Sequence, residues 1–179
     1  MTKMFVRNAT CQDKAAIHDL YVSAFAEDER ALVSELALAL LMEESMPATI
    51  SLIAEVDGML AGHVAFSPVH TEVDERFLGY IVAPLAVMPE HQKHGIGTAL
   101  IEHGKRAVLE AGAGVLFVYG DPAYYGRFGF DARIAERFVP PYTLQYPFGW
   151  QAIALSELAA GVSPVRVICV NALSDPALW

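Results

Sequence analysis

The chain has 179 residues, of which 54% are hydrophobic and 18% charged, and its formal net charge is −9. This composition supplies enough apolar side chains for one sizeable core, which excludes a disordered chain and predicts a single domain over residues 1–179. The acidic surplus argues against a nucleic-acid-binding protein, because affinity for phosphate backbones comes from clustered lysine and arginine side chains.

The N-terminal residues and the spacing of the cysteines indicate in which cellular compartment the protein resides. Charged side chains interrupt the first eight residues, so no signal peptide is predicted. No apolar run reaches the roughly 18–20 residues that a membrane span requires. Cys11 and Cys169 lie far apart without paired spacing, which indicates free thiols, and we expect both to be buried as small hydrophobic side chains. These features predict a soluble cytoplasmic protein that does not bind a membrane.

The first quarter of the chain predicts a short strand and two amphipathic helices. The strand covers residues 5–7, and Thr10–Asp13 after it is typical of a capping box. The buried side of the first helix is formed by Ile17, Leu20, Tyr21, Ala24 and Phe25. A second helix begins after the acidic residues 27–29 and ends at Met46-Pro47. Its inward-facing side chains are Leu32, Val33, Leu36, Leu40 and Leu41.

A β-hairpin and a third, longer strand follow. Residues 50–56 and 59–69 are rich in β-branched and apolar side chains, and Asp57-Gly58 between them is a typical two-residue hairpin turn. The third strand covers residues 77–88 and contains Pro84, which has no main-chain N–H to donate. We therefore expect a bulge or an edge position there rather than a regular central strand.

Beyond residue 96 the apolar spacing becomes that of a helix, which ends at Ala111-Gly112. A buried strand follows at 115–119, so residues 77–119 predict a strand–helix–strand unit whose strands run parallel. The remaining expected elements are an aromatic helix or turn at 124–128 and strands at 151–155 and 165–170. This order predicts an α+β or mixed α/β fold with one central, mostly antiparallel sheet, one parallel βαβ pair and flanking helices.

The loop before the helix at Ile96 carries the strongest indication of a binding site. Gly95 and Gly97 allow a ligand to approach the backbone closely, and the free N–H groups of a helix N-terminus favour an anion such as phosphate. Lys93 and His94 add positive character. A dinucleotide-binding pattern would need glycine at position 100, and a P-loop would need lysine after Gly97. A tight turn without a ligand is the alternative.

Two motifs in this order resemble those of the GNAT acetyltransferase superfamily. The first is Gln-x-x-Gly-x-Gly at 92–97, preceded by a Leu-Ala-Val-x-Pro strand end, and the second is Tyr-x-x-x-Gly-Phe at 125–130. Within the superfamily the chain is similar to the stand-alone YhbS-like bacterial branch. The resemblance implies the GNAT fold and direct transfer of an acetyl group from acetyl-CoA to a small-molecule, peptide or protein amine, without an acyl-enzyme. Homodimers are frequent in this superfamily.

The resemblance also implies roles for individual residues. Main-chain groups of Leu85, Ala86 and Val87 would bind the pantetheine arm of acetyl-CoA and polarise its thioester carbonyl. The loop residues expected to bind the pyrophosphate are Gln92, Lys93, His94, Gly95, Ile96, Gly97 and Thr98. Tyr125 would protonate the departing thiolate. The alternative for Tyr125 is simple core packing with Phe128 and Phe130.

No metal site is expected, and the general base has no motif. The histidines at 91, 94 and 103 lack the spacing and the carboxylate or thiolate partners of a familiar metal site. Candidates for the base that takes the amine proton are His63, His70, Glu27, Glu29 and Glu72. For each of them, a solvated carboxylate or a histidine held by structural hydrogen bonds is the alternative.

Acidic residues cluster between positions 27 and 44, where a single arginine, Arg30, opposes Glu27, Asp28, Glu29, Glu35, Glu43 and Glu44. In the GNAT fold the first two helices form a wall of the acceptor cleft, so this surplus predicts a cationic acceptor, with plain solvation as the alternative. An aromatic group either covers the acceptor pocket or forms a packing loop: Tyr142, Tyr146, Phe148 and Trp150. Two other protein classes stay open: a non-catalytic acyl-CoA-binding or sensing module, and a structural domain in which both motifs are only turns and core.

Overall fold

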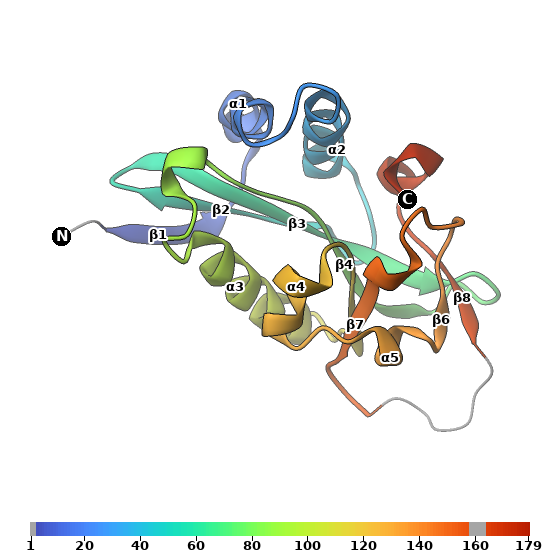
Figure 1. Cartoon of the computed structure of the whole chain (residues 1–179). Coiled ribbons are helices and arrows are strands. Elements are labelled where there is room, and N and C mark those ends of the chain that lie inside the picture. The colour runs from blue at the N-terminus through green and yellow to red at the C-terminus, as the bar shows by residue number, and fades with distance from the viewer. Residues whose placement is uncertain (1–2, 158–163) are drawn as a thin grey trace.

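The computed structural model describes residues 3–157 and 164–179, and its centre is one twisted β-sheet with helices on both faces (Figure 1). The strands lie in the spatial order β1-β2-β3-β4-β5-β7. Their bounds are Met4–Asn8 (β1), Ile50–Val56 (β2), Met59–Thr71 (β3), Phe77–Val87 (β4), Val115–Tyr119 (β5) and Trp150–Ala154 (β7). Neighbours along this order are antiparallel except β4 and β5, which run parallel. The predicted fold class is confirmed.

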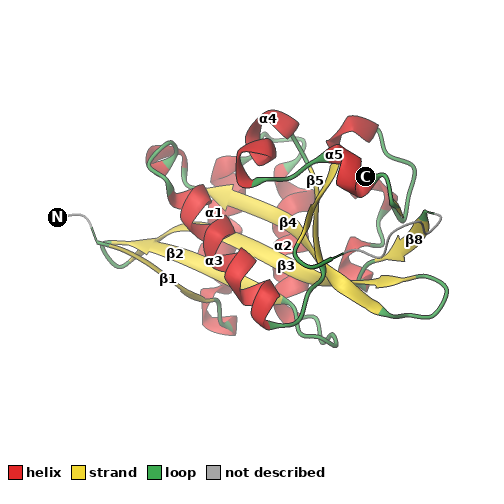
Figure 2. Ribbon diagram, turned by 90° about the horizontal axis from the view of Figure 1, so that it is seen from below, coloured by secondary structure: helices red, strands yellow, loops and turns green. Residues whose placement is uncertain are grey.

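Three long helices cover the sheet. Helices α1 (Lys14–Ala24) and α2 (Arg30–Met42) lie on one face, and α3 (Ile96–Glu110) crosses the other (Figures 1 and 2). Two four-residue helices, α4 (Pro122–Tyr125) and α5 (Ala132–Ala135), follow β5. The apolar stripes turn inward as expected, with α1 burying Ile17, Leu20 and Tyr21 and α3 burying Ile96, Leu100, Ile101 and Val108. In the described part of the chain, no helix is long and apolar enough to cross a membrane.

The β2–β3 hairpin forms where the sequence predicts it. Asp57 and Gly58 have φ values of 50° and 82°, and two successive positive φ angles are what a type I′ turn requires. On the far side of β3 the pairing with β4 shifts, because Val64 pairs with Leu85 whereas Phe66 pairs with Val82. Three residues of β4 thus span two of β3, which places a bulge at Pro84. The bulge is confirmed, although β4 is a central strand between β3 and β5.

The C-terminal part adds a small second ladder that the sequence did not predict. Strand β8 (Val165–Ile168) pairs antiparallel with the end of β3 through His70 and Ile168, and parallel with the two-residue β6 (Phe138–Val139). The strand expected at 165–170 therefore exists but ends two residues earlier. The C-terminal segment after β8 returns to pack against the face that α2 covers.

The two cysteines differ in environment. Cys11 is exposed in the turn before α1, so the expectation that both cysteines are buried is wrong for this residue. Cys169 packs beside the core cluster that contains Leu36 of α2, and burial raises the pKa of its thiol to about 12. Both thiols are free.

Candidate active site

Strands β4 and β5 separate halfway along β4. They pair from Gly79 with Val115 to Val82 with Val118, and the pairing then ends, while β4 continues beside β3 as far as Val87. The bulge at Pro84 accounts for this, because it turns the strand and because proline has no N–H to donate. The β5-facing edge of β4 is therefore left without a strand partner over the residues predicted to bind the pantetheine arm.

The loop after β4 leads into the N-terminus of α3. Gly95 caps the helix with a φ of 82°, and Lys93 also has a positive φ, 64°. The first intrahelical bond runs from the Ala99 N–H to the Gly95 carbonyl, so the preceding N–H groups have no partner within the helix. The Gln92 side chain donates to the Val87 carbonyl over 3.2 Å and so ties the loop to the end of β4. These groups form an anion-binding helix N-terminus beside the open strand edge.

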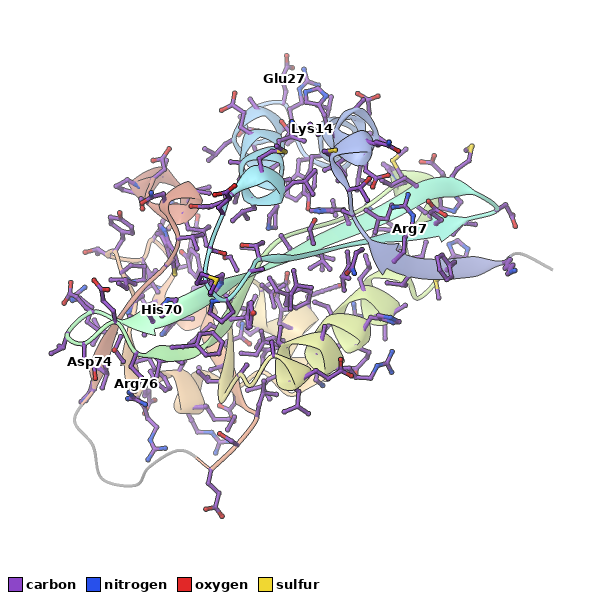
Figure 3. The ribbon with its side chains drawn as sticks, turned by 180° about the vertical axis from the view of Figure 1, so that it is seen from behind. Arg7, Lys14, Glu27, His70, Asp74 and Arg76 are labelled. Atoms are coloured by element: carbon purple, nitrogen blue, oxygen red, sulfur yellow. The ribbon has the colours of Figure 1, made fainter. Side chains whose placement is uncertain are left out.

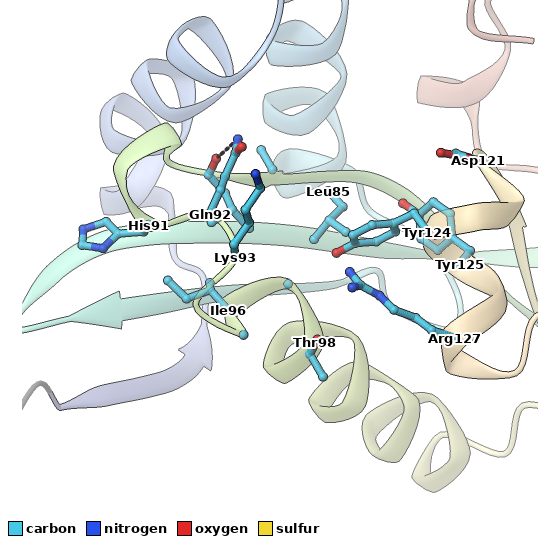
Figure 4. Close-up of a pocket in the computed structure, with 14 residues that line it drawn as sticks. Leu85, His91, Gln92, Lys93, Ile96, Thr98, Asp121, Tyr124, Tyr125 and Arg127 are labelled. Atoms are coloured by element: carbon cyan, nitrogen blue, oxygen red, sulfur yellow. Dashed lines mark hydrogen bonds between the residues drawn. The ribbon is translucent and has the colours of Figure 1, made fainter.

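A cavity of about 700 Å³ lies between this loop, the open edge of β4 and the α4 segment (Figure 4). We call it the loop cavity. Of the predicted site residues, Leu85, Ala86, Val87, Gln92, Lys93, Gly95, Ile96, Gly97, Thr98 and Tyr125 line it. His94 is exposed and does not line it. The structure therefore brings both sequence motifs to one cavity.

The sequence did not single out four further lining residues: His91, Asp121, Tyr124 and Arg127. The Arg127 guanidinium carbon lies 4.0 Å from the centroid of the Tyr124 ring, a distance at which a cation is attracted to the aromatic face. Both side chains extend from the α4 segment toward the loop (Figure 4). Arg127 and Lys93 supply positive charge to the cavity. The position of Arg127 inside the second motif was the signal that could have identified it.

Tyr125 combines core packing with access to the cavity. Its ring stands edge-on to Phe130 and Tyr124, with centroids 5.7 Å and 4.9 Å apart, and it fills the space beside Gly120. Burial, with a smaller contribution from Tyr124, raises the pKa of the Tyr125 phenol above its usual range. The phenol is therefore neutral near pH 7, and it holds its proton more tightly than an exposed tyrosine does. Packing and proton donation are compatible at this position.

A second, smaller cavity of about 230 Å³ lies on the side of α1, α2 and the C-terminal segment. We call it the apolar cavity. Phe25, directly after α1, and Val33 of α2 line one side, and Trp179 comes from the C-terminal segment. Leu85 and Tyr125 line this cavity as well as the loop cavity. The two cavities therefore meet at Leu85 and Tyr125, beside the point where β4 and β5 separate.

None of the candidate bases lines either cavity. His63 is fully buried, with Nδ1 2.7 Å from the Tyr21 hydroxyl and Nε2 2.8 Å from the Ser51 hydroxyl. Burial lowers the pKa of His63 to about 3, so its ring is neutral, and both ring nitrogens are occupied by these hydrogen bonds. His70 and Glu72 lie at the far end of β3, near the turn labelled by Asp74 in Figure 3. His63 is therefore a histidine held by structural hydrogen bonds, which was the alternative to a general base.

The acidic cluster lies outside both cavities. Glu27, Asp28 and Glu29 occupy the connection between α1 and α2, and the Glu27 side chain is 89% exposed (Figure 3). Glu43 accepts a hydrogen bond from the Ala172 N–H at the end of α2. None of the six acids lines the loop cavity or the apolar cavity. The first two helices do form a cavity wall, as expected, but that wall is apolar rather than acidic.

The aromatic tail forms a packing loop. Trp150 stacks on Phe117 of β5 with ring centroids 5.1 Å apart, and Tyr142 contacts the Trp179 ring. Tyr146 and Phe148 are exposed. None of these four residues of the aromatic tail lines the apolar cavity, whereas Trp179 does.

The histidines at 91, 94 and 103 do not gather into a site. Across residues 3–157 and 164–179, no three histidine, cysteine, aspartate or glutamate residues lie close enough together to hold a metal ion.

A central sheet that opens between two parallel strands, next to a glycine-rich loop and a helix N-terminus, defines the fold of the GNAT acetyltransferases. The sequence model of the Acetyltransferase (GNAT) family matches residues 14–130, and the chain belongs to this family of acyltransferases. The matched range includes both motifs and every residue of the loop cavity. The predicted family is therefore confirmed.

Relatives and solved structures agree with this assignment. The chain is 33% identical to the protein named uncharacterized N-acetyltransferase YjhQ of Escherichia coli, over 74% of this chain and 72% of YjhQ. A GNAT family acetyltransferase from Brucella melitensis, solved with acetyl-CoA, superimposes with a TM-score of 0.72 at 29% identity and covers 96% of this chain and 99% of its own. YhbS of E. coli, solved with CoA, superimposes with a TM-score of 0.78 at 26% identity, and the match covers 98% of this chain and 94% of the YhbS chain.

Proposed function

We propose that the chain binds acetyl-CoA in the loop cavity and transfers the acetyl group to an amine held in the apolar cavity. The observation that carries this proposal is the meeting of the two cavities at Leu85 and Tyr125. A thioester lying along the open edge of β4 would reach this junction from one side, and an amine would reach it from the other. The acetyl-CoA and CoA complexes of the Brucella and E. coli structures support the first half.

The loop cavity suits the cofactor's chemistry. Its phosphates would accept hydrogen bonds from the free N–H groups at the start of α3, with Lys93 and Arg127 as the nearby cations. The pantetheine amides would pair with the main chain of β4 from Ala83 to Val87, in the way an added strand does. Gly97 leaves the helix start free of a side chain. The main-chain groups in these interactions, at the β5-facing edge of β4 and at the start of α3, have no partner in the sheet or in the helix.

Transfer needs little covalent chemistry from the protein. The amine nitrogen attacks the thioester carbon, so that a C–N bond forms and the C–S bond breaks. Main-chain N–H groups of β4 would stabilise the negative charge that develops on the carbonyl oxygen. Tyr125 would give its proton to the departing sulfur and regain one from solvent. No ionisable side chain other than Tyr125 and Tyr119 lines the apolar cavity in the described residues, so water would take the amine proton.

The alternative is a module that binds acyl-CoA as a sensor without turnover. Such a module would need the loop cavity alone, whereas here Tyr125 also opens onto a second cavity. This observation favours catalysis. The state of assembly, for which the family resemblance implies a homodimer, stays a prediction.

The test combines binding with turnover. Acetyl-CoA at a hundred times its dissociation constant is expected to stabilise the fold by about 2.7 kcal/mol, which a thermal shift detects. Release of free thiol from acetyl-CoA should then depend on an added amine. Absence of a thermal shift at millimolar acetyl-CoA would overturn both the enzyme and the sensor, whereas a shift without amine-dependent thiol release from any amine would leave the sensor.

A further inference from the structure

The lining of the apolar cavity indicates what kind of amine it accepts. Phe25 comes directly after α1, α2 supplies Val33 and Leu36, the bulged part of β4 supplies Pro84 and Leu85, and Trp179 closes the opposite side. None of the described residues that line it carries a charged side chain. The polar side chains are the two tyrosines, Tyr119 and Tyr125. The Tyr119 hydroxyl already accepts the Tyr146 N–H over 2.9 Å and donates to the Trp179 main-chain oxygen over 3.4 Å.

An acceptor with a second charge would lose hydration here without gaining a side chain of opposite charge as a partner. Transferring an ammonium or carboxylate group from water into an apolar environment is strongly unfavourable unless an opposite charge is placed beside it. The Glu27 side chain of the acidic cluster is 89% exposed and points into solvent (Figure 3). Water and salt therefore weaken the attraction of its charge for a group in the cavity.

We propose that the acceptor is a small primary amine on an uncharged aromatic or branched aliphatic body. This inference rests on the proposed acetyl transfer. The body lies between Phe25, Val33 and Trp179, and its burial supplies the binding energy. The amino group points toward Tyr125 and Leu85, where the two cavities meet. The volume of about 230 Å³ fits one ring system with a short side chain.

The substrate test compares amines that differ in the charge of their bodies. Benzylamine and tryptamine represent the apolar class, and spermidine and lysine represent amines with a second charge. With acetyl-CoA fixed, we expect kcat/KM for the apolar pair to exceed that for the charged pair by at least about tenfold. Preferential acetylation of spermidine or lysine would overturn this inference but leave the acetyltransferase assignment intact. Thiol release with none of the amines, despite acetyl-CoA binding, would overturn both.

A pair of variants on the same helix separates the cavity from general charge effects. Val33→Asp places a carboxylate in the cavity wall, while Ala39→Asp places the same charge on the exposed side of α2. We expect Val33→Asp to lower kcat/KM for tryptamine by about tenfold or more and Ala39→Asp to change it less than about twofold. Asparagine has the shape of aspartate without its charge, so the kcat/KM of Val33→Asn for tryptamine should lie between the values of the two aspartate variants. The KM for acetyl-CoA should stay unchanged in all three.

A readout independent of turnover keeps the inference testable if Val33→Asp folds poorly. Tryptamine is expected to bind the wild-type protein in calorimetry in the presence of CoA, and spermidine is not. Equal effects of Val33→Asp and Ala39→Asp on tryptamine, or binding of spermidine in preference to tryptamine, would overturn the assignment of the apolar cavity as the acceptor site.

Discussion

The hydroxyl group of Tyr124 occupies the space that a Cβ atom at Gly97 would need. Gly97 ends the first motif at the start of α3, and Tyr124 lies in α4, directly before the second motif. Their contact joins the loop to the segment that carries Tyr125. Glycine is needed at position 97 because of this approach, and not because of its φ angle, which lies in the range of ordinary residues.

Gly97→Ala should therefore weaken acetyl-CoA binding. The new methyl group must displace the Tyr124 ring, which lines the loop cavity, and we expect the dissociation constant to rise by about tenfold. Gly97→Glu would add a carboxylate where phosphate is expected and should abolish binding. Gly126→Ala is the matched control, since open space surrounds Gly126 and its φ is −56°. Calorimetry with equal affinities for Gly97→Ala and Gly126→Ala would contradict the proposed phosphate site.

Tyr125→Phe should lower kcat by on the order of 100-fold with little change in the KM for acetyl-CoA. The substitution keeps the ring contacts with Tyr124 and Phe130 but removes the proton that the departing thiolate would take. Tyr146→Phe, at an exposed tyrosine outside both cavities, is the control. Steady-state kinetics by thiol release measures both. If Tyr125→Phe keeps a normal kcat, a group other than Tyr125 donates the proton.

The pH profile tests the same residue in the wild-type protein. Burial raises the pKa of Tyr125 above the usual value of 10, so its proton is retained through neutral and mildly alkaline pH. We expect kcat to show no loss up to about pH 9.5 that is attributable to Tyr125 deprotonation. An alkaline loss with a midpoint near pH 8 that disappears in Tyr125→Phe would show that its phenol ionises far more easily than its burial implies.

Neutralising the exposed acids should leave acetyl transfer unchanged. In the triple variant Glu27→Gln, Asp28→Asn, Glu29→Gln, we expect kcat/KM for every amine to stay within about twofold at physiological ionic strength, where the Debye length is about 8 Å. The reason is that these side chains face solvent and none lines the apolar cavity. A large, selective loss for spermidine would restore the cationic acceptor that the sequence alone predicted.

His63 should make the fold less stable in acid. Its pKa is about 3 in the folded protein and near 6.5 in an unfolded chain, so the unfolded state binds the extra proton between these values. Stability is therefore complete above about pH 6.5 and falls as the pH drops, with a slope that approaches 1.4 kcal/mol per pH unit. Urea unfolding between about pH 5 and 6.5 measures the slope.

Two comparisons assign that slope to His63. His63→Gln, which removes the titrating ring, should flatten it, whereas His18→Gln, at a half-exposed histidine, should not. An NMR titration provides the direct measurement, because the His63 ring should remain neutral down to about pH 4. A ring that protonates near pH 6.5 would contradict the buried hydrogen bonds to Tyr21 and Ser51.

Local patterns in the sequence were sufficient for much of the fold. The hairpin at Asp57-Gly58, the C-terminal end of α3 at Ala111-Gly112 and the bulge at Pro84 all depend on the φ preferences or missing N–H of a few neighbouring residues. The loop cavity was also predictable, because its loop residues are consecutive and the two motifs each follow a strand. Of the four lining residues that were not predicted, Arg127 lies within the second motif and Tyr124 directly precedes it.

By itself, then, the sequence determined the elements, the family and the loop that would hold acetyl-CoA, since spacing and backbone preference act over a few residues. Only the tertiary structure decided which residues line the apolar cavity. The wall expected to be acidic is apolar, because Val33 of α2 and Trp179 from the other end of the chain line it, whereas Glu27 in the connection between α1 and α2 is exposed. The tertiary structure also places His63 in hydrogen bonds with Tyr21 and Ser51. Contacts between distant residues depend on how the faces of the elements pack, which no local pattern records.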